Sequence, residues 1–317
     1  MRRSAATIGV ALFLVVSLAL PVLPDPVPAE TIVQTIIGHR KRFDMPAVDA
    51  EQGYILIDVT KVDLDEDGIG DITPVAILLL FPGGTGKLEI KDEQLSISQT
   101  NFLVRTRDHF AAEGFVVAVM DAASDFLTLP EGLLGHRVAG KPHSEKHLAD
   151  IQAVMNDLRG KFPSLPLWAP AGAPYRQLGL PQSLLLLRTL FITMWRRPLG
   201  RARAAAELAS PADGLVLTSP LTGPSGAGDL GGVDLESVVA PALVVTNKND
   251  ACPVTRPEDA ADLKKRLVSS ERVRVLFFKG GNQPLTDSCD SLSSHGFFGI
   301  EQRVIEAVAK WIKHAEK

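Results

Sequence analysis

Pro74-Val-Ala-Ile-Leu-Leu-Leu-Phe-Pro-Gly-Gly-Thr-Gly86 is the stretch of sequence that decides the fold. It opens with a continuous apolar run, which is typical of a strand covered by helices on both faces, and a glycine-rich turn ends it. Apolar residues at near-helical spacing follow over residues 101–113, and Gly114 then precedes a second apolar run at residues 115–120. The segment therefore predicts a strand–helix–strand unit.

The same alternation continues along the chain. Strands are expected at residues 53–62, 165–168, 215–218, 242–246 and 273–278, and helices at 147–159, 258–267 and 300–314. Strands that alternate with helices indicate an α/β fold with a mostly parallel central sheet flanked by helices. A length of 317 residues suits one such domain, which we place at residues 30–317.

The first 29 residues have the three parts of a secretory signal peptide. Arg2 and Arg3 form a basic start, residues 5–20 are apolar, and prolines follow through Pro28. We expect cleavage near Ala29 and export to the periplasm or the medium. An uncleaved membrane anchor is the alternative, although the apolar run is short and the prolines would break a spanning helix.

Charge and cysteine content narrow the possible partners. The 33 basic and 37 acidic side chains give a net charge of −4 without a basic stripe, so nucleic acid is not an expected partner.

The two cysteines, Cys252 and Cys289, are an even count in a chain expected to be exported, which predicts a disulfide between them. Two unpaired buried thiols are the alternative.

Several motifs, in order along the chain, resemble the α/β-hydrolase superfamily, and closely a bacterial exported subgroup of it. The matching stretches are Phe81-Pro-Gly-Gly-Thr-Gly, Asn101-Phe-Leu-Val-Arg-Thr-Arg, Phe115-Val-Val-Ala-Val-Met-Asp-Ala, Asp213-Gly-Leu-Val-Leu-Thr-Ser, Asn249-Asp-Ala-Cys and Ser294-His-Gly-Phe-Phe-Gly-Ile-Glu. The resemblance implies serine-dependent hydrolysis of an ester or related acyl bond in a small molecule, with neither a metal ion nor an organic cofactor.

The resemblance also assigns residues to roles. Asp250 corresponds to the family's carboxylate, which holds the imidazole, and His295 to the base, which takes the proton of the serine. Gly83 and Gly84 correspond to the oxyanion loop, where backbone N–H groups face the developing negative oxygen. An ordinary loop acid, a surface histidine and a plain glycine turn are the alternative interpretations.

The nucleophile serine is missing from its expected place. Where the family has a Gly-x-Ser-x-Gly elbow, this chain reads Leu167-Trp-Ala-Pro-Ala-Gly-Ala-Pro, and the serine would fall about where Pro170 and Ala171 stand. The codons that can encode residues 168–177 can also be read in the frame that starts one nucleotide earlier. In that frame they permit the sequence Gly-Thr-Ser-Arg-Gly. We therefore interpret residues 169–209, with their odd composition, as a possible frame disruption. Ser183 and Ser219 are the serines considered as substitutes, and neither is part of an elbow.

The expected product is an impaired hydrolase, a pseudoenzyme. A non-catalytic relative that binds a small ligand, and a lipid-associated protein that uses residues 182–195, are the alternatives; membrane contact is the weaker of these expectations. An acidic turn over residues 63–71 matches the opening of a calcium loop but lacks the closing glutamate, so a solvated turn is expected there and a calcium site is the alternative; no metal ligand is assigned.

Overall fold

The computed structural model describes residues 30–40, 49–63, 70–83, 85–88, 90–91, 94–95, 100–130, 132–133, 144–172, 212–222, 230, 235–236 and 238–315. The expected signal peptide and the 182–195 segment lie outside the described residues, as does the anomalous stretch beyond Gly172. Most of the acidic turn at 63–71 also lies outside them.

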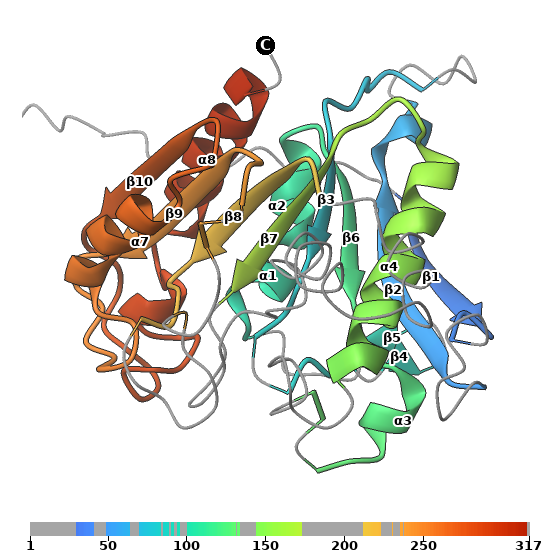
Figure 1. Ribbon diagram of the computed structural model, residues 1–317, viewed down its shortest axis with the longest axis horizontal. Helices are drawn as coiled ribbons and strands as arrows, with labels where there is room; N and C mark the ends of the chain where they lie inside the picture. Colours follow the sequence, from blue (N-terminus) through green and yellow to red (C-terminus); the bar gives the residue numbers. More distant parts are fainter. Residues whose placement is uncertain are drawn as a thin grey trace, which may run out of the picture.

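An eight-stranded sheet forms the centre of the molecule, in the order β1-β2-β6-β3-β7-β8-β9-β10 (Figure 1). The strands are β1 (Glu30–Ile37), β2 (Glu51–Asp58), β3 (Ile77–Leu80), β6 (Val116–Met120), β7 (Leu167–Gly172), β8 (Gly214–Thr218), β9 (Ala242–Asn247) and β10 (Val273–Phe278). The strands from β6 to β10 in this order are parallel, and β1 and β2 pair antiparallel at one edge. The predicted mostly parallel α/β sheet is confirmed. Strand β1 was not predicted from the sequence.

Helices cover both faces of the sheet. They are α1 (Phe102–Arg105), α2 (Arg107–Ala112), α3 (Ser124–Leu127), α4 (Ser144–Lys161), α7 (Ala260–Arg266) and α8 (Glu301–Ala315). In Figure 1, α1, α2 and α8 lie behind the sheet, and α4 and α7 lie in front of it. A small hairpin of β4 (Ile90–Lys91) and β5 (Gln94–Leu95) forms a second, two-stranded sheet.

The helix expected over residues 101–113 is divided in two at Thr106. The Thr106 hydroxyl donates to the carbonyl of Phe102 at 2.6 Å, one turn earlier, and the residue has the non-helical angles φ −106° and ψ 6°. A side-chain hydroxyl that bonds back to the preceding turn competes with regular helix geometry. The apolar spacing predicted the buried face correctly, but not this break.

Strand β7 is packed tightly into the sheet at its amino end. Trp168 is fully buried, and its ring lies edge-on to Trp311 of α8 at 5.3 Å. Gly214, opposite Trp168 on β8, leaves room for the indole, because a Cβ at Gly214 would lie 2.2 Å from it. The register of β7 against β8 therefore depends on a large residue facing a glycine.

The proline in β7 does not interrupt its pairing with β8. The Leu167 carbonyl accepts from Asp213 at the start of β8, whereas the Pro166 carbonyl accepts from Ile77 of β3. Since hydrogen-bonding directions alternate along a strand, the position of Pro170 faces β3. The pairing of β3 with β7 ends at Trp168, before Pro170 is reached. Because Pro170 faces β3 and not β8, the absence of its N–H removes no hydrogen bond from the pairing of β7 with β8.

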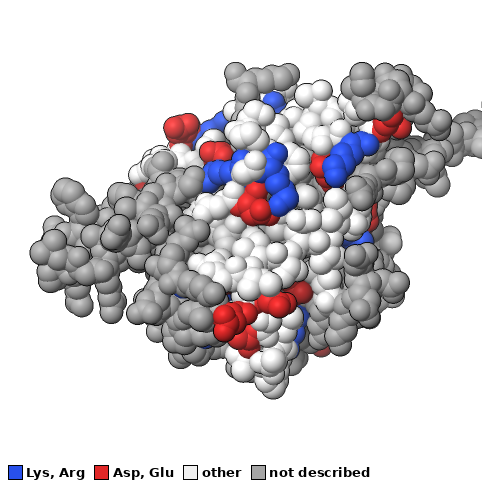
Figure 2. All heavy atoms as spheres, turned by 90° about the vertical axis from the view of Figure 1, so that its right-hand side faces the viewer, with Lys and Arg blue, Asp and Glu red and all other residues white. Residues whose placement is uncertain are grey.

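Figure 2 shows the face that carries β1 and α4. Basic and acidic side chains are mixed there and separated by uncharged surface, and no single sign dominates the described part of this face. Among the described residues, no helix is long and apolar enough to cross a membrane.

Candidate active site at the carboxyl edge of the sheet

The residues singled out in the sequence follow the carboxyl ends of neighbouring strands, at the lower edge of the sheet in Figure 1. Gly83 follows β3, Asp250 follows β9, and His295 lies beyond β10 in a short 3₁₀ turn, η5 (Ser294–Gly296). Strand β7 lies between β3 and β8 in the sheet order. Ligands of open parallel sheets bind outside the carboxyl ends of the strands, so this is the expected edge for a site.

Asparagine side chains form the turn that presents Asp250. The Asp250 N–H donates to the carbonyl of Asn247 at 2.9 Å, closing the turn after β9. The Asn247 side chain donates to the carbonyl of Gly280, and the Asn249 side chain accepts from the Gly280 N–H, both at 3.0 Å. These bonds tie the Asp250 turn to the loop after β10, so the two loops that form the site are held to each other.

A compact turn fixes His295. The Ser293 hydroxyl accepts from the His295 N–H at 3.2 Å, which caps η5. Gly296 is required there, because a Cβ would lie 1.9 Å from the Ser291 carbonyl oxygen. Phe297 takes the left-handed conformation at φ 59° and packs its ring 5.0 Å from that of Phe102. The left-handed backbone at Phe297 is strained, and packing of its ring offsets the strain. These requirements at Gly296 and Phe297 explain the His-Gly-Phe sequence.

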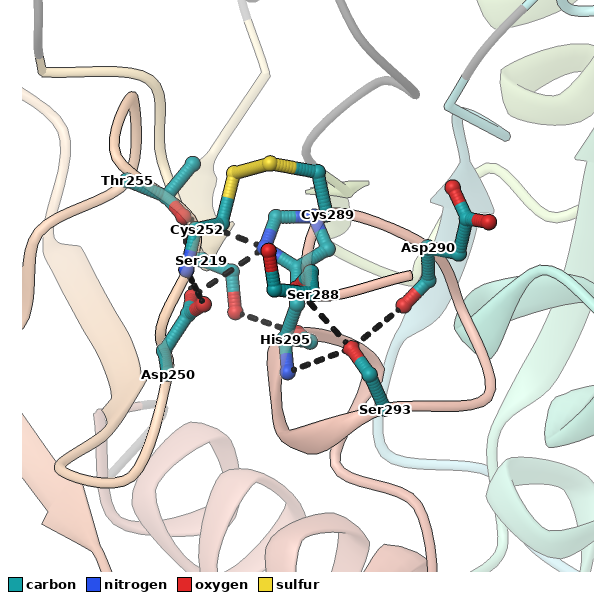
Figure 3. Close-up of a disulfide and its surroundings, with 9 residues drawn as sticks. All are labelled: Ser219, Asp250, Cys252, Thr255, Ser288, Cys289, Asp290, Ser293 and His295. Atoms are coloured by element: carbon teal, nitrogen blue, oxygen red, sulfur yellow. Dashed lines mark hydrogen bonds and ion pairs between the residues drawn. A yellow bond between two sulfur atoms is a disulfide. The ribbon is translucent and has the colours of Figure 1, made fainter. Parts of the chain in front are cut away.

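Asp250 and His295 are in direct contact (Figure 3). The His295 Nδ1 atom lies 3.1 Å from the Asp250 Oδ2 atom, and both residues are buried. A carboxylate only accepts hydrogen bonds, so the Nδ1 atom carries the proton and the Nε2 atom keeps its lone pair. Figure 3 shows the Nε2 edge of the ring turned away from Asp250. This is the tautomer that a general base requires.

The predicted disulfide is present. Cys252 and Cys289 are joined, with their Cα atoms 4.7 Å apart, and the bond links the loop after Asp250 to the loop before His295. The Cys252 N–H also donates to the Asp250 Oδ1 atom at 2.9 Å. The disulfide thus anchors a residue that itself binds the carboxylate.

The loop that begins at Gly83 is held by Asp121, at the end of β6. The Asp121 carboxylate accepts from the N–H of Leu88 at 2.6 Å and from its neighbour Ala122 at 2.7 Å. Gly83 follows the carboxyl end of β3, and β3 is the neighbour of β7 in the sheet. Gly84 lies outside the described residues.

No hydroxyl is available on β7. The strand runs from Leu167 to Gly172 and includes Pro170 and Ala171, so none of its residues is a serine, threonine or cysteine. Ser219, at the end of β8, is adjacent to His295 and has a left-handed φ of 44°, but its hydroxyl donates to the His295 main-chain carbonyl at 2.7 Å. Among the described residues, none hydrogen-bonds to the Nε2 atom of His295.

Neither a family model nor a curated protein matches this chain. Solved structures do. A lipase in its open form is 12% identical, and the superposition covers 90% of this chain and 100% of the lipase with a TM-score of 0.52. The chain has the α/β-hydrolase fold.

Two further structures are less similar. A serine hydrolase homologue from Coxiella burnetii is 11% identical, with 89% of this chain and 96% of that one covered and a TM-score of 0.47. Brefeldin A esterase, a bacterial homologue of human hormone-sensitive lipase, is 13% identical, with 97% and 81% covered and a TM-score of 0.48.

Among the cavities lined by described residues, the larger one does not lie at the carboxyl edge of the sheet. A groove of about 630 Å³, lined by residues such as Asp58, Pro74 and Leu165, lies at the amino ends of the parallel strands. The cavity against His295, between Asn101 and Ser219, has room for about one water molecule. The part of the chain that the structure describes contains no group of His, Cys, Asp or Glu side chains suited to a metal ion.

Sequence reasoning missed two residues that support the pair. Thr255 is 1% exposed, and its hydroxyl contacts both Asp250 and His295. Arg105 donates to the Gly296 carbonyl at 2.6 Å and to Glu301, and burial lowers its pKa by more than Glu301 raises it. Neither residue belongs to a periodic pattern, so only the folded structure shows its role.

Proposed function

We propose that this chain is a serine-hydrolase relative that keeps the base and its carboxylate, His295 and Asp250, but has lost the nucleophile from β7. The lineage activity is hydrolysis of an ester or related acyl bond in a small molecule. The observation that carries the proposal is the 3.1 Å contact of the buried pair at the carboxyl edge of an α/β-hydrolase fold, in a sheet whose strand β7 carries no hydroxyl. The protein is exported, in keeping with its N-terminal sequence and its disulfide.

The remaining groups define what chemistry is left. With its proton on Nδ1, the imidazole of His295 can take a proton at Nε2, and Asp250 stabilises the resulting charge. Without a serine there is no oxygen to form the acyl intermediate. Because the members of a triad act as a unit, losing the nucleophile costs nearly as much as losing all three. We expect ester turnover close to the uncatalysed rate.

The cause proposed for this loss is a shift of reading frame over residues 169–209. Resequencing the gene across the codons for residues 165–213 tests this directly. A neighbouring frame that reads Gly-Thr-Ser-Arg-Gly after Trp168 identifies an interrupted serine hydrolase. A confirmed in-frame sequence instead identifies a protein that has truly lost its nucleophile.

Labelling with a fluorophosphonate probe, together with turnover of p-nitrophenyl acetate and butyrate, tests the activity. The expected result is no labelled serine, and turnover no faster than that of His295→Ala. If the probe labels a serine and His295→Ala abolishes that labelling, the proposal is refuted, because such labelling requires a serine activated by His295. Ligand-dependent melting without turnover would identify the non-catalytic binding relative, and vesicle flotation lost on deleting residues 182–195 would identify the lipid-associated one.

A further inference from the structure

Thr255 completes a three-membered hydrogen-bonded group with the acid and the base (Figure 3). Its hydroxyl oxygen lies 2.9 Å from the Asp250 Oδ2 atom and 3.1 Å from the His295 Nδ1 atom, which are themselves 3.1 Å apart. All three side chains are buried. Each of the three atoms is therefore within hydrogen-bond distance of the other two.

We propose that Thr255 is a positioning residue that, together with Asp250, holds the proton of His295 on the Nδ1 atom and so keeps Nε2 free to act as the base. The proposal rests on the function proposed above, in which His295 acts at Nε2. Thr255 acts through His295 and Asp250.

Counting protons shows why the arrangement selects one tautomer. With a proton on Nδ1, the Thr255 hydroxyl donates to the carboxylate, and the Nδ1–H is shared between the carboxylate and the hydroxyl oxygen. All three contacts are then satisfied. With the proton on Nε2, the hydroxyl can donate to Oδ2 or to Nδ1 but accepts from neither, so Thr255 loses one of its two hydrogen bonds. The lone pairs of Nδ1 and Oδ2 then also face each other at 3.1 Å, a penalty that Asp250 imposes with or without the hydroxyl. An unsatisfied buried contact of this kind is unfavourable.

The backbone around Thr255 holds the hydroxyl in place. Its N–H donates to the Cys252 carbonyl at 3.2 Å, and the preceding Val254 carbonyl accepts from the N–H of Thr222 at 2.9 Å. Cys252 is itself tied to Cys289 by the disulfide. The hydroxyl is therefore fixed by contacts on both sides, as a residue that orients another side chain needs to be.

Nitrogen-15 NMR of the histidine rings in the full chain tests the proposal, because it reports the tautomer directly and needs no enzymatic activity. Thr255→Val keeps the volume and removes the hydroxyl, Thr255→Ala removes it without the bulk, and Thr255→Ser keeps it. We expect the wild type and Thr255→Ser to show protonated Nδ1 and bare Nε2 at His295. In Thr255→Val and Thr255→Ala, the ratio of Nδ1–H to Nε2–H should fall by about fivefold or more, the effect of losing one hydrogen bond.

The hydroxyl-free variants decide the outcome. If Thr255→Val and Thr255→Ala both keep the wild-type tautomer ratio, the proposal is overturned; if Thr255→Val does not fold, Thr255→Ala alone decides. A serine variant that behaves like the valine variant would also overturn it, since the hydroxyl would not be the acting group. Failure of the proposed function is seen separately, as probe labelling of a serine, and leaves the tautomer result unaffected.

Discussion

Replacing Arg40 by methionine should destabilise the protein more than any other single change among the ion pairs of the described residues. Arg40 lies just after β1, and its side chain is fully buried. Its guanidinium donates to the Asp150 carboxylate through Nε at 2.8 Å and Nη2 at 2.7 Å, and to Asp125 at 2.8 and 3.0 Å. His39 and Lys146 complete what we term the charge cluster (His39, Arg40, Asp125, Lys146 and Asp150).

The magnitude follows from what the substitution leaves behind. The side chain of Asp150 is fully buried, and in the Arg40→Met protein its remaining partner among the described residues is His39, at 2.6 Å. Removing one member of a buried ion pair costs about 3–5 kcal/mol, because the other charge stays buried without compensation. Asp125 is 22% exposed and can be resolvated, so it adds little to this cost.

Urea unfolding at pH 7, with the disulfide intact, measures this cost. Lys146→Met is the matched control: it removes a cation that contacts only the partly exposed Asp125, at 3.0 Å, and should cost about 1 kcal/mol or less. Adding Asp150→Asn to Arg40→Met should recover part of the loss, since the uncompensated charge is removed. The reasoning fails if Arg40→Met costs less than about 1 kcal/mol, or if the double variant loses the full sum of the single variants.

Three further outcomes are expected. Gly214→Ala should cost about 1–3 kcal/mol in thermal or urea unfolding, because its Cβ would lie 2.2 Å from Trp168; a neutral effect would mean that β7 and β8 are not in this register. Replacing Cys252 and Cys289 by serine should lower the free energy of unfolding by about 4 kcal/mol, from the loop of 37 residues that the disulfide closes; an unchanged denaturation midpoint would exclude the linkage. Burial alone would raise the pKa of Asp125, but the cations of the charge cluster outweigh it and lower that pKa, so its stabilisation is present above about pH 4 and lost as the pH falls through the lowered value. Asp125→Asn should therefore flatten the fall of the urea midpoint between about pH 5 and pH 2, and an unchanged slope would contradict the assignment.

The central strands could be predicted from the sequence because burial on both faces leaves a continuous apolar run. Strands such as β3 and β6 are fully buried, and their short, uninterrupted patterns have no competing interpretation. Strand β1 lies at the edge of the sheet, and its residues 31–37 are half-exposed or exposed. An edge strand gains its structure from pairing with β2, which a local pattern does not reveal.

The pair Asp250 and His295 could be predicted because the residues next to each of them in the chain form short motifs. The turn needs asparagines just before Asp250, and the backbone needs a glycine and a phenylalanine just after His295. Each of these residues lies at a fixed distance along the chain from the site residue that it supports. The contribution of Thr255 depends instead on the distance between two loops that lie 40 residues apart along the chain. No pattern of spacing encodes such a distance.

Among the described residues, the support for Asp250 and His295 comes mainly from the part of the chain after β7. The loops after β9 and β10, the disulfide and the cap of η5 supply it, and Arg105 and Phe102 add contacts from α1. None of these contacts involves β7. A damaged nucleophile segment and an ordered acid–base pair are therefore compatible in one molecule, because the two halves of the site are stabilised by different elements. For the same reason, the geometry of the pair is no argument for activity, and labelling by a serine-directed probe is the measurement that decides it.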